Sequence, residues 1–217
     1  MKNNFFYVSE IFDSIEGEGK RTGIMSIFVR LTGCNLRCSY CDTKYALVMG
    51  KEAIKMTEDE LVNKVKEYPW KNITITGGEP LLHCLNDLLL KLPEYDINIE
   101  TNGATPLLSH RPQNVFYTMD WKCPTSGENK KMLYENLKLL TKYDVLKFVV
   151  GNQEDLDEMK RVISLFKDVS PLFYVSPVFN KINPVDIVDY VKKNKLKNVY
   201  IQIQLHKVIW NPNQRGV

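Results

Sequence analysis

The chain has 217 residues, of which 44% are hydrophobic, and this predicts one domain of ordinary size with a sizeable buried core. Its formal net charge of +3 is too small to indicate a nucleic-acid partner. Since no apolar run reaches about 18 residues, no membrane span is expected. The five cysteines are an odd number and argue against a secreted disulfide framework, so a cytoplasmic protein is expected.

The first predicted elements are two strands separated by a glycine-containing loop. A short strand begins at Tyr7, and Gly17 and Gly19 then form a loop, up to residue 20, whose backbone can approach a ligand closely. The next strand, residues 26–31, is apolar apart from Ser26 and Arg30. A buried arginine needs an anionic partner, so Arg30 either forms a structural ion pair or binds a substrate carboxylate.

Three cysteines follow this strand in the pattern C-x3-C-x2-C, at Cys34, Cys38 and Cys41. Soft thiolate ligands suit zinc or an iron–sulfur cluster. A structural zinc site is closed by four ligands, whereas three thiolates can hold three irons of a [4Fe–4S] cluster and leave the fourth iron open. The other two cysteines, Cys84 and Cys123, are expected to be buried free thiols.

The rest of the chain alternates between helices and strands. A capping box at 57–60 predicts a helix to about residue 68, and the strand at 72–76 ends in Gly77-Gly78-Glu79-Pro80. Helices are predicted at 81–92, 130–143, 154–166 and 184–193, and strands at 97–100, 115–119, 145–150, 172–175 and 199–204. This alternation predicts a parallel α/β sheet or barrel, in which ligands gather at the carboxyl ends of the strands.

The cysteine motif, the Tyr40 and Asp42-Thr43 that flank Cys41, and the later Gly-Gly-Glu-Pro together resemble the radical S-adenosylmethionine (SAM) superfamily. The resemblance implies a partial, TIM-like parallel barrel formed by a single domain over residues 1–217. It also implies a [4Fe–4S] cluster on the three cysteines and SAM on the open iron. A 5′-deoxyadenosyl radical then does the chemistry, and no acid or base catalyst is assigned.

Further segments narrow the resemblance to the 7-carboxy-7-deazaguanine synthases: residues 14–19, 28–36, 41–43, 100–103, 204–207 and 215–217. That family implies a carbon–nitrogen lyase that contracts 6-carboxy-5,6,7,8-tetrahydropterin to 7-carboxy-7-deazaguanine with loss of ammonia, in queuosine and 7-deazapurine biosynthesis. It implies Mg²⁺ as an additional cofactor and a homodimer. An electron donor such as flavodoxin or ferredoxin is the expected partner, and neither nucleic acid nor a membrane is expected.

The resemblance also assigns residues. Thr43 would offer its hydroxyl to Mg²⁺, which prefers oxygen ligands. The substrate would be bound by Ile15, Glu16, Gly17, Glu18, Arg30, Thr101, His206 and the terminal carboxylate of Val217. SAM would be bound by Gly77, Gly78, Glu79, Gly103, Asp120, Trp121, Lys122, Ser176, Pro177, Val178 and Phe179. The chain departs from the family at Glu16, where glutamine is frequent, and at 120–122, where Ser-Pro-Lys is frequent.

Expectations also follow for three other groups of residues. His83 and His110 are expected at the surface or as caps, and the lysines at 192–197 on a solvated helix face. The tail after residue 204 is expected to fold back over the strand ends and cover the substrate. Two alternative functions stay open: a radical SAM activase of a glycyl-radical enzyme, which needs no pterin loop, and a non-enzymatic zinc-binding interaction module.

Overall fold

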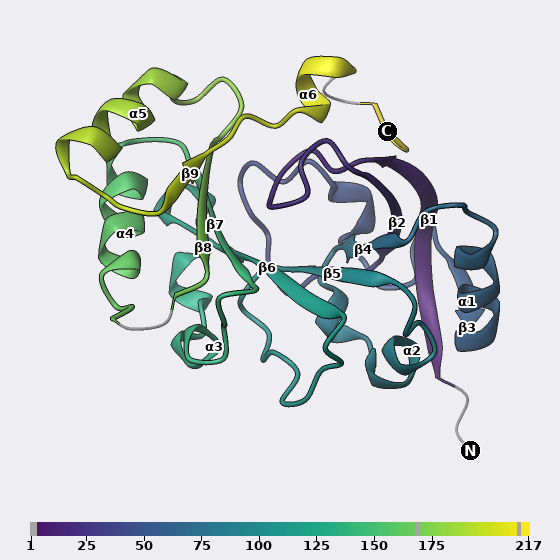
Figure 1. The fold of residues 1–217 in the computed structure, drawn as a ribbon. Coiled ribbons are helices and arrows are strands. Elements are labelled where there is room, and N and C mark those ends of the chain that lie inside the picture. Colours follow the sequence, from purple (N-terminus) through teal and green to yellow (C-terminus); the bar gives the residue numbers. More distant parts are fainter. Residues whose placement is uncertain (1–3, 168–169, 212–213) are drawn as a thin grey trace.

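The computed structural model describes residues 4–167, 170–211 and 214–217. Within these residues the strands form one sheet in the order β3-β1-β2-β4-β5-β6-β7-β8-β9 (Figure 1). The strands are β1 (Phe5–Ile15), β2 (Met25–Leu31), β3 (Ile54–Thr57), β4 (Asn72–Gly77), β5 (Asp96–Thr101), β6 (Val115–Trp121), β7 (Val145–Val150), β8 (Leu172–Pro177) and β9 (Val199–Ile201).

The pairs from β2 to β9 are all parallel, whereas β1 runs antiparallel to both β2 and β3. The strands β3 and β9 are the two edges of the curved sheet, and they do not pair with each other. The sheet is therefore an open, partial barrel, which confirms the prediction. The helices are α1 (Glu58–Lys66), α2 (Asn86–Leu90), α3 (Tyr134–Leu137), α4 (Gln153–Ile163), α5 (Pro184–Lys193) and α6 (His206–Ile209).

The two faces of the curved sheet differ in chemistry because side chains alternate along each strand. The outer face is apolar and fully buried, as at Ile73, Ile97 and Phe148, and forms the core. The alternate residues of β4 to β8 form the concave face, where apolar or aromatic side chains such as Phe116, Val145 and Tyr174 lie beside polar ones: Thr74, Thr76, Asn98, Glu100, Thr118, Asp120, Lys147 and Ser176. This polar interior surface holds the candidate site.

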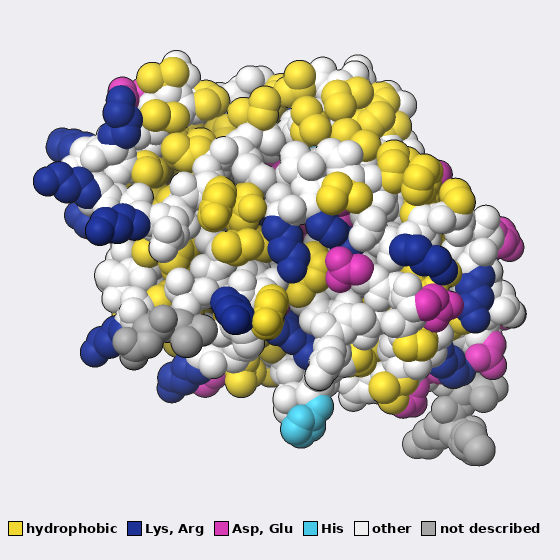
Figure 2. All heavy atoms as spheres, viewed as in Figure 1, with side chains coloured by type: hydrophobic (Ala, Val, Ile, Leu, Met, Phe, Trp, Pro, Cys, Tyr) yellow, Lys and Arg dark blue, Asp and Glu magenta, His cyan; other side chains and the backbone are white. Residues whose placement is uncertain are grey.

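Several predicted elements are confirmed. The capping box at Thr57 forms as expected, with Glu60 Nα donating to Thr57 Oγ1 at 3.3 Å and Thr57 Nα donating to Glu60 Oε2 at 2.7 Å. The strand at 145–150 and the helix at 184–193 have the predicted bounds. The lysines at 192, 193, 195 and 197 are exposed, and Figure 2 shows basic side chains gathered on the α4–α5 side.

Other predictions were wrong. The helix expected at 130–143 is only a 3₁₀ turn (Asn129–Lys131) followed by α3, because Leu133 Nα donates to the Gly103 carbonyl instead of continuing a helix. The segment 81–92 contains a 3₁₀ turn (Pro80–Leu82) and the short α2, β3 was not predicted, and β9 ends at Ile201. His83 is buried, with its Nε2 atom 2.9 Å from the Thr32 carbonyl, and Cys84 is exposed. No described helix is long and apolar enough to cross a membrane.

Candidate active site

The cysteine loop follows β2 directly and is anchored at several points. Cys34 Nα donates to the Leu47 carbonyl at 3.0 Å. Further along, Ser39 Nα donates to the Ser126 carbonyl at 3.0 Å and Arg37 Nα donates to Glu128 Oε1 at 2.5 Å. These contacts hold Cys34, Cys38 and Cys41 at the carboxyl end of the sheet, where all three thiols are free and partly exposed.

The sulfur chemistry of this loop fits an iron–sulfur cluster. Cys34 Sγ accepts hydrogen bonds from Leu36 Nα at 3.4 Å and from Asn102 Nδ2 at 3.7 Å, and such donors to sulfur tune a cluster. Burial raises the pKa of the Cys38 thiol to about 11 and also raises the pKa of Cys41. Among the described residues, no three His, Cys, Asp or Glu side chains converge as they would around a single metal ion. The agreement with an iron–sulfur cluster thus comes from the three thiols of the loop and from the N–H groups that donate to Cys34 Sγ.

Asn102 is a functional candidate that sequence reasoning missed. It follows β5 and also donates from Nδ2 to Asn35 Oδ1 at 2.8 Å, so it joins the end of β5 to the cysteine loop. Its backbone is fixed by Glu79, whose Oε2 accepts from Asn102 Nα at 2.7 Å. The sequence did carry a signal for Asn102, because it follows a predicted strand and lies between Thr101 and Gly103, which were both expected to contact ligands.

The Glu79 carboxylate is fully buried and engaged within the protein. Its Oε1 accepts from Thr101 Oγ1 at 2.8 Å and from Leu81 Nα at 3.0 Å, in addition to the Asn102 contact. Burial raises the pKa of Glu79, and these donors oppose that rise. In this structure the Glu79 and Thr101 side chains therefore support the loop around Asn102, and the ligand contacts expected for them stay predictions.

Gly77 and Gly78 are required by packing between backbones. A Cβ atom on Gly77 would lie 2.0 Å from the Leu31 carbonyl oxygen, and one on Gly78 would lie 2.1 Å from that of Gly33. Gly78 Nα donates to Leu31 O at 2.9 Å, so the end of β4 rests on the residues that lead into Cys34. Close approach to the residues after β2 is therefore one reason for these glycines, and the SAM contact expected for them stays a prediction.

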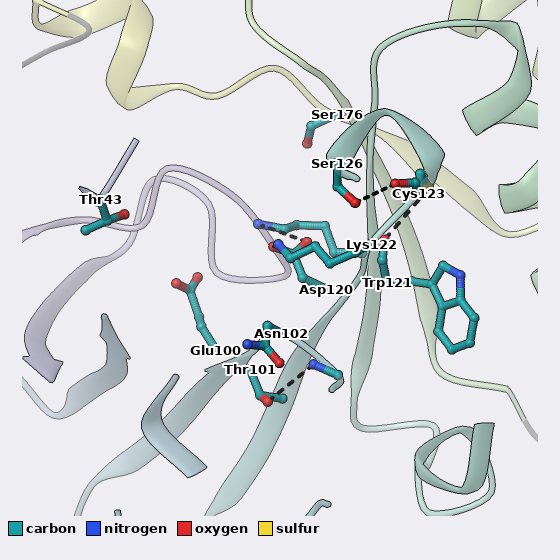
Figure 3. Close-up of polar contacts among 12 residues, drawn as sticks. Thr43, Glu100, Thr101, Asn102, Asp120, Trp121, Lys122, Cys123, Ser126 and Ser176 are labelled. Atoms are coloured by element: carbon teal, nitrogen blue, oxygen red, sulfur yellow. Dashed lines mark hydrogen bonds and ion pairs between the residues drawn. The ribbon is translucent and has the colours of Figure 1, made fainter. Parts of the chain in front are cut away.

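A chain of alternating charges occupies the concave face. Lys147 Nζ lies 3.1 Å from Glu18 Oε2 and 3.7 Å from Asp120 Oδ1. Lys122 Nζ lies 2.8 Å from Asp120 Oδ2, and Figure 3 shows these two side chains together. Burial alone would lower the pKa of Lys147, but the neighbouring carboxylates raise it well above its ordinary value. Burial would likewise raise the pKa of Glu18, but Lys147 and the Ser176 hydroxyl bring it down to about 2. Lys147 and Glu18 are therefore charged at neutral pH.

Trp121 does not share this surface. Its Nε1 donates to Glu158 Oε1 at 3.0 Å, and its ring meets Tyr134 edge-on at a centroid distance of 5.0 Å. Figure 3 shows the indole pointing away from Asp120 and Lys122. The Trp121 side chain is therefore removed from the expected SAM-binding set, because strand alternation turns it to the outer face.

Polar atoms without hydrogen-bond partners mark the same interior. Within the described part of the chain, these buried atoms on the concave face are Asn98 Oδ1, Thr118 Oγ1 and Asp120 Oδ1. Buried polar groups are rarely left unsatisfied in proteins. Their presence here indicates that the polar part of the concave face, called the chamber below, is suited to a polar ligand or to ordered water.

The loop between β1 and β2, residues 16–24, lies across the open side of the sheet (Figure 1). Glu16 is 1% exposed and accepts from Arg21 Nη2 at 2.8 Å, from Ser26 Oγ at 3.0 Å and from Thr74 Oγ1. This buried ion pair holds the Glu16 carboxylate inside the loop, and its expected substrate contact stays a prediction. Glu18 points into the chamber instead, where its Oε1 accepts from Ser176 Oγ at 2.7 Å.

The C-terminal tail meets this loop. Gly17 has no room for a side chain, because a Cβ atom there would lie 2.0 Å from His206 Nδ1. Burial lowers the pKa of His206, and the Glu18 charge opposes that shift. Past the tail helix α6, the Arg215 guanidinium lies 3.4 Å from the centroid of the Tyr45 ring, and the C-terminus lies near the ends of β1 and β2 in Figure 1. The tail therefore returns to the strand ends, and its expected role in covering the substrate stays a prediction.

The remaining expected site residues surround this region. Arg30 Nε donates to Glu10 Oε1 at 2.6 Å, and Thr43 Oγ1 donates to Asp42 Oδ1 at 2.8 Å. After β8, Val178 is buried, whereas Phe179 is 48% exposed with its ring centroid 5.8 Å from Lys207 Nζ. Gly103 adopts a φ of +73°, which favours glycine.

Comparison with known proteins identifies the relatives of this chain. Residues 28–117 match the Radical SAM superfamily. The chain is 46% identical to the 7-carboxy-7-deazaguanine synthase of Clostridium acetobutylicum, over 98% of this chain and 99% of the relative. It is 38% identical to that of Koribacter versatilis, over 97% and 99%. The crystal structure of QueE from Escherichia coli has the same fold, with a TM-score of 0.77 at 22% identity over 93% of this chain and 95% of QueE. The chain belongs to the 7-carboxy-7-deazaguanine synthase family.

Proposed function

We propose that this protein is a radical SAM lyase that converts 6-carboxy-5,6,7,8-tetrahydropterin to 7-carboxy-7-deazaguanine with loss of ammonia, a step toward queuosine and related 7-deazapurines. The observation that carries the proposal is the polar chamber beside the cysteine loop, in a chain 46% identical to a 7-carboxy-7-deazaguanine synthase over nearly its full length. Anaerobic incubation with SAM, a reductant and the carboxypterin tests it through the mass of the product.

Cys34, Cys38 and Cys41 would hold the [4Fe–4S] cluster, and Asn102 would orient the Cys34 sulfur. When bound, the cluster and SAM together supply a carbon-centred radical. The chain's own residues shield that chemistry from water and fix the reactants in place. Gly103, Lys122 and the 176–178 segment are the groups that we assign to SAM, because they lie at the ends of β5, β6 and β8.

The charged groups would recognise the pterin. The Glu18 carboxylate can accept two hydrogen bonds from the aminopyrimidine edge, since an ionised carboxylate only accepts. The contact between Arg30 and Glu10 uses Nε, so the Nη groups of Arg30 can bind a substrate carboxylate side by side. His206 and the Val217 carboxylate would close the site from the tail.

We assign Mg²⁺ to the loop after the last cysteine, where Thr43 and Asp42 place oxygen atoms next to each other. Thr43→Val keeps the shape of the side chain but removes the hydroxyl. Turnover should fall about tenfold and its response to Mg²⁺ should flatten, with iron content unchanged, as expected for the loss of one oxygen ligand. Thr43→Ser, which keeps the oxygen, should restore the response. A Mg²⁺ titration of Thr43→Val that matches the native one would contradict this assignment.

The terminal carboxylate of Val217 should contribute to pterin binding. A peptide added after Val217 would move the terminal carboxylate and should weaken pterin binding about tenfold, while cluster content and SAM binding stay unchanged. Pterin affinity and melting temperature should be measured for the native and extended proteins, with the same peptide at the N-terminus as the control. Equal affinity and turnover in the extended protein would rule the role out, and a lowered melting temperature with unchanged affinity would indicate packing alone.

Two further features belong to the proposal. We propose a homodimer, which sedimentation of the purified protein tests, and an external electron donor such as flavodoxin or ferredoxin.

Metal analysis separates the enzyme from a zinc-binding module, because the enzyme should contain iron and sulfide. A glycyl-radical activase would cleave SAM but leave the carboxypterin unchanged.

A further inference from the structure

Gln202, which directly follows β9, binds the backbone of the loop that carries Glu18. Its Oε1 accepts from Gly19 Nα at 2.8 Å, and its Nε2 donates to the Gly19 carbonyl at 2.9 Å. Nε2 also lies 3.0 Å from Thr22 Oγ1, to which it donates. The side-chain amide thus pairs with both polar groups of one peptide residue, as a neighbouring strand would.

The loop is shaped to accept this contact. Gly19 has a φ of +79°, a left-handed conformation that favours glycine, and it turns the backbone toward Gln202. Thr22 Oγ1 donates to the same Gly19 carbonyl at 2.7 Å, so Thr22 and Gln202 act on one peptide group. The residue that precedes Gly19 is Glu18, so a shift at Gly19 would move the Glu18 carboxylate.

Gln202 itself is held by the sheet. Its backbone nitrogen donates to the Val175 carbonyl of β8 at 2.9 Å, which continues the pairing of β8 with β9. The next residue to contact the loop is Gln204, whose Nε2 lies 3.3 Å from Glu18 Oε2, and Leu205 Nα donates to the Gly17 carbonyl at 3.1 Å. The segment 202–205 therefore connects the last strand to the loop across the side where the sheet is open.

We infer that Gln202 is a positioning residue for substrate binding: it fixes Gly19 relative to β8 and thereby aims Glu18 into the chamber. This inference rests on the proposed function, because it takes Glu18 as a pterin contact. Glu18 is also held by Lys147 and Ser176, which come from β7 and β8. Gln202 acts on the backbone, and so it limits the directions from which Glu18 can meet those partners.

The test compares Gln202→Leu and Gln202→Asn with the native protein and with Gln153→Leu, an exposed glutamine on α4. The leucine removes the amide, while the asparagine keeps an amide that is one methylene too short to reach Gly19. Without turnover, both Gln202 variants should bind the carboxypterin about tenfold more weakly, since they lose two or three neutral hydrogen bonds. SAM affinity and iron content should stay at native values, and Gln153→Leu should match the native protein.

A second readout does not depend on the pterin. Trypsin cleavage after Lys20, within the loop, should be faster in both Gln202 variants than in the native protein and in Gln153→Leu. Native pterin affinity together with native cleavage rates in the Gln202 variants would overturn the inference. If the native protein fails to bind the carboxypterin, the proposed function fails, and the cleavage rates alone then decide whether Gln202 holds the loop. Equal losses of pterin and SAM affinity would indicate general unfolding and would also overturn a positioning role.

Discussion

Replacing any one of Cys34, Cys38 and Cys41 with alanine should abolish SAM cleavage, with a loss of at least about a thousandfold in rate, because the initiating step depends on the cluster. Each of the three thiols should ligate one iron, and a cluster with two protein ligands is exposed and unstable. The protein should remain folded, since all three cysteines are partly exposed and lie outside the sheet. Iron and sulfide content, visible absorption and the yield of 5′-deoxyadenosine are the measurements.

The chain provides two matched controls. Cys84 is exposed and Cys123 is buried, with its Sγ 3.8 Å from the Trp121 carbonyl oxygen. Cys84→Ala and Cys123→Ala should keep a full cluster and native SAM cleavage. Loss of the cluster in either control, with the fold intact, would favour a site with four cysteine ligands.

Replacing Glu18 with glutamine should weaken pterin binding about a hundredfold, because a carboxylate that accepts charge-assisted hydrogen bonds is exchanged for a neutral amide. The new amide would also place a donor near Lys147 and Ser176, which both donate to Glu18 in the native protein. SAM binding and the cluster should be unaffected. Glu94→Gln, at an exposed loop position, serves as the control. Native pterin affinity in Glu18→Gln would remove Glu18 from the substrate site.

Glu18 should also make stability depend on pH. Its pKa is lowered from 4.5 to about 2 in the folded protein, so its ionised form stabilises the fold above pH 4.5. This stabilisation, on the order of 3 kcal/mol, should be lost as the pH falls from 4.5 toward 2. The difference in unfolding free energy between the native protein and Glu18→Gln should therefore shrink over that range. A difference that does not vary with pH would contradict a lowered pKa of Glu18 in the folded protein.

The sequence was sufficient for the parallel architecture and for the cluster motif, because both depend on local patterns. The buried strand at 145–150 and the proline-initiated helix at 184–193 are fixed by residues adjacent in the chain. The cysteine spacing is local as well. The same holds for the position of Gly77 at a strand end, although its packing against Leu31 could be seen only in three dimensions.

Contacts between distant segments account for what sequence reasoning missed. A helix at 130–143 agrees with local propensity, but the Gly103 carbonyl binds Leu133 Nα and Asn136 Nδ2 and fixes this segment in another path. The family resemblance placed Glu16 in the pterin-binding loop, but it did not indicate that the Glu16 carboxylate is buried in an ion pair with Arg21. Gln202 pairs with Gly19 from 183 positions away, and no local pattern predicts such a contact.

Anaerobic turnover tests the central claim most directly. The reconstituted protein, supplied with reductant, Mg²⁺ and excess 6-carboxy-5,6,7,8-tetrahydropterin, should be given SAM in an amount below that of the pterin. We predict a product with the mass of 7-carboxy-7-deazaguanine, together with ammonia, in an amount that exceeds the SAM supplied. Cleavage of SAM to 5′-deoxyadenosine with the carboxypterin recovered unchanged would contradict the proposed function.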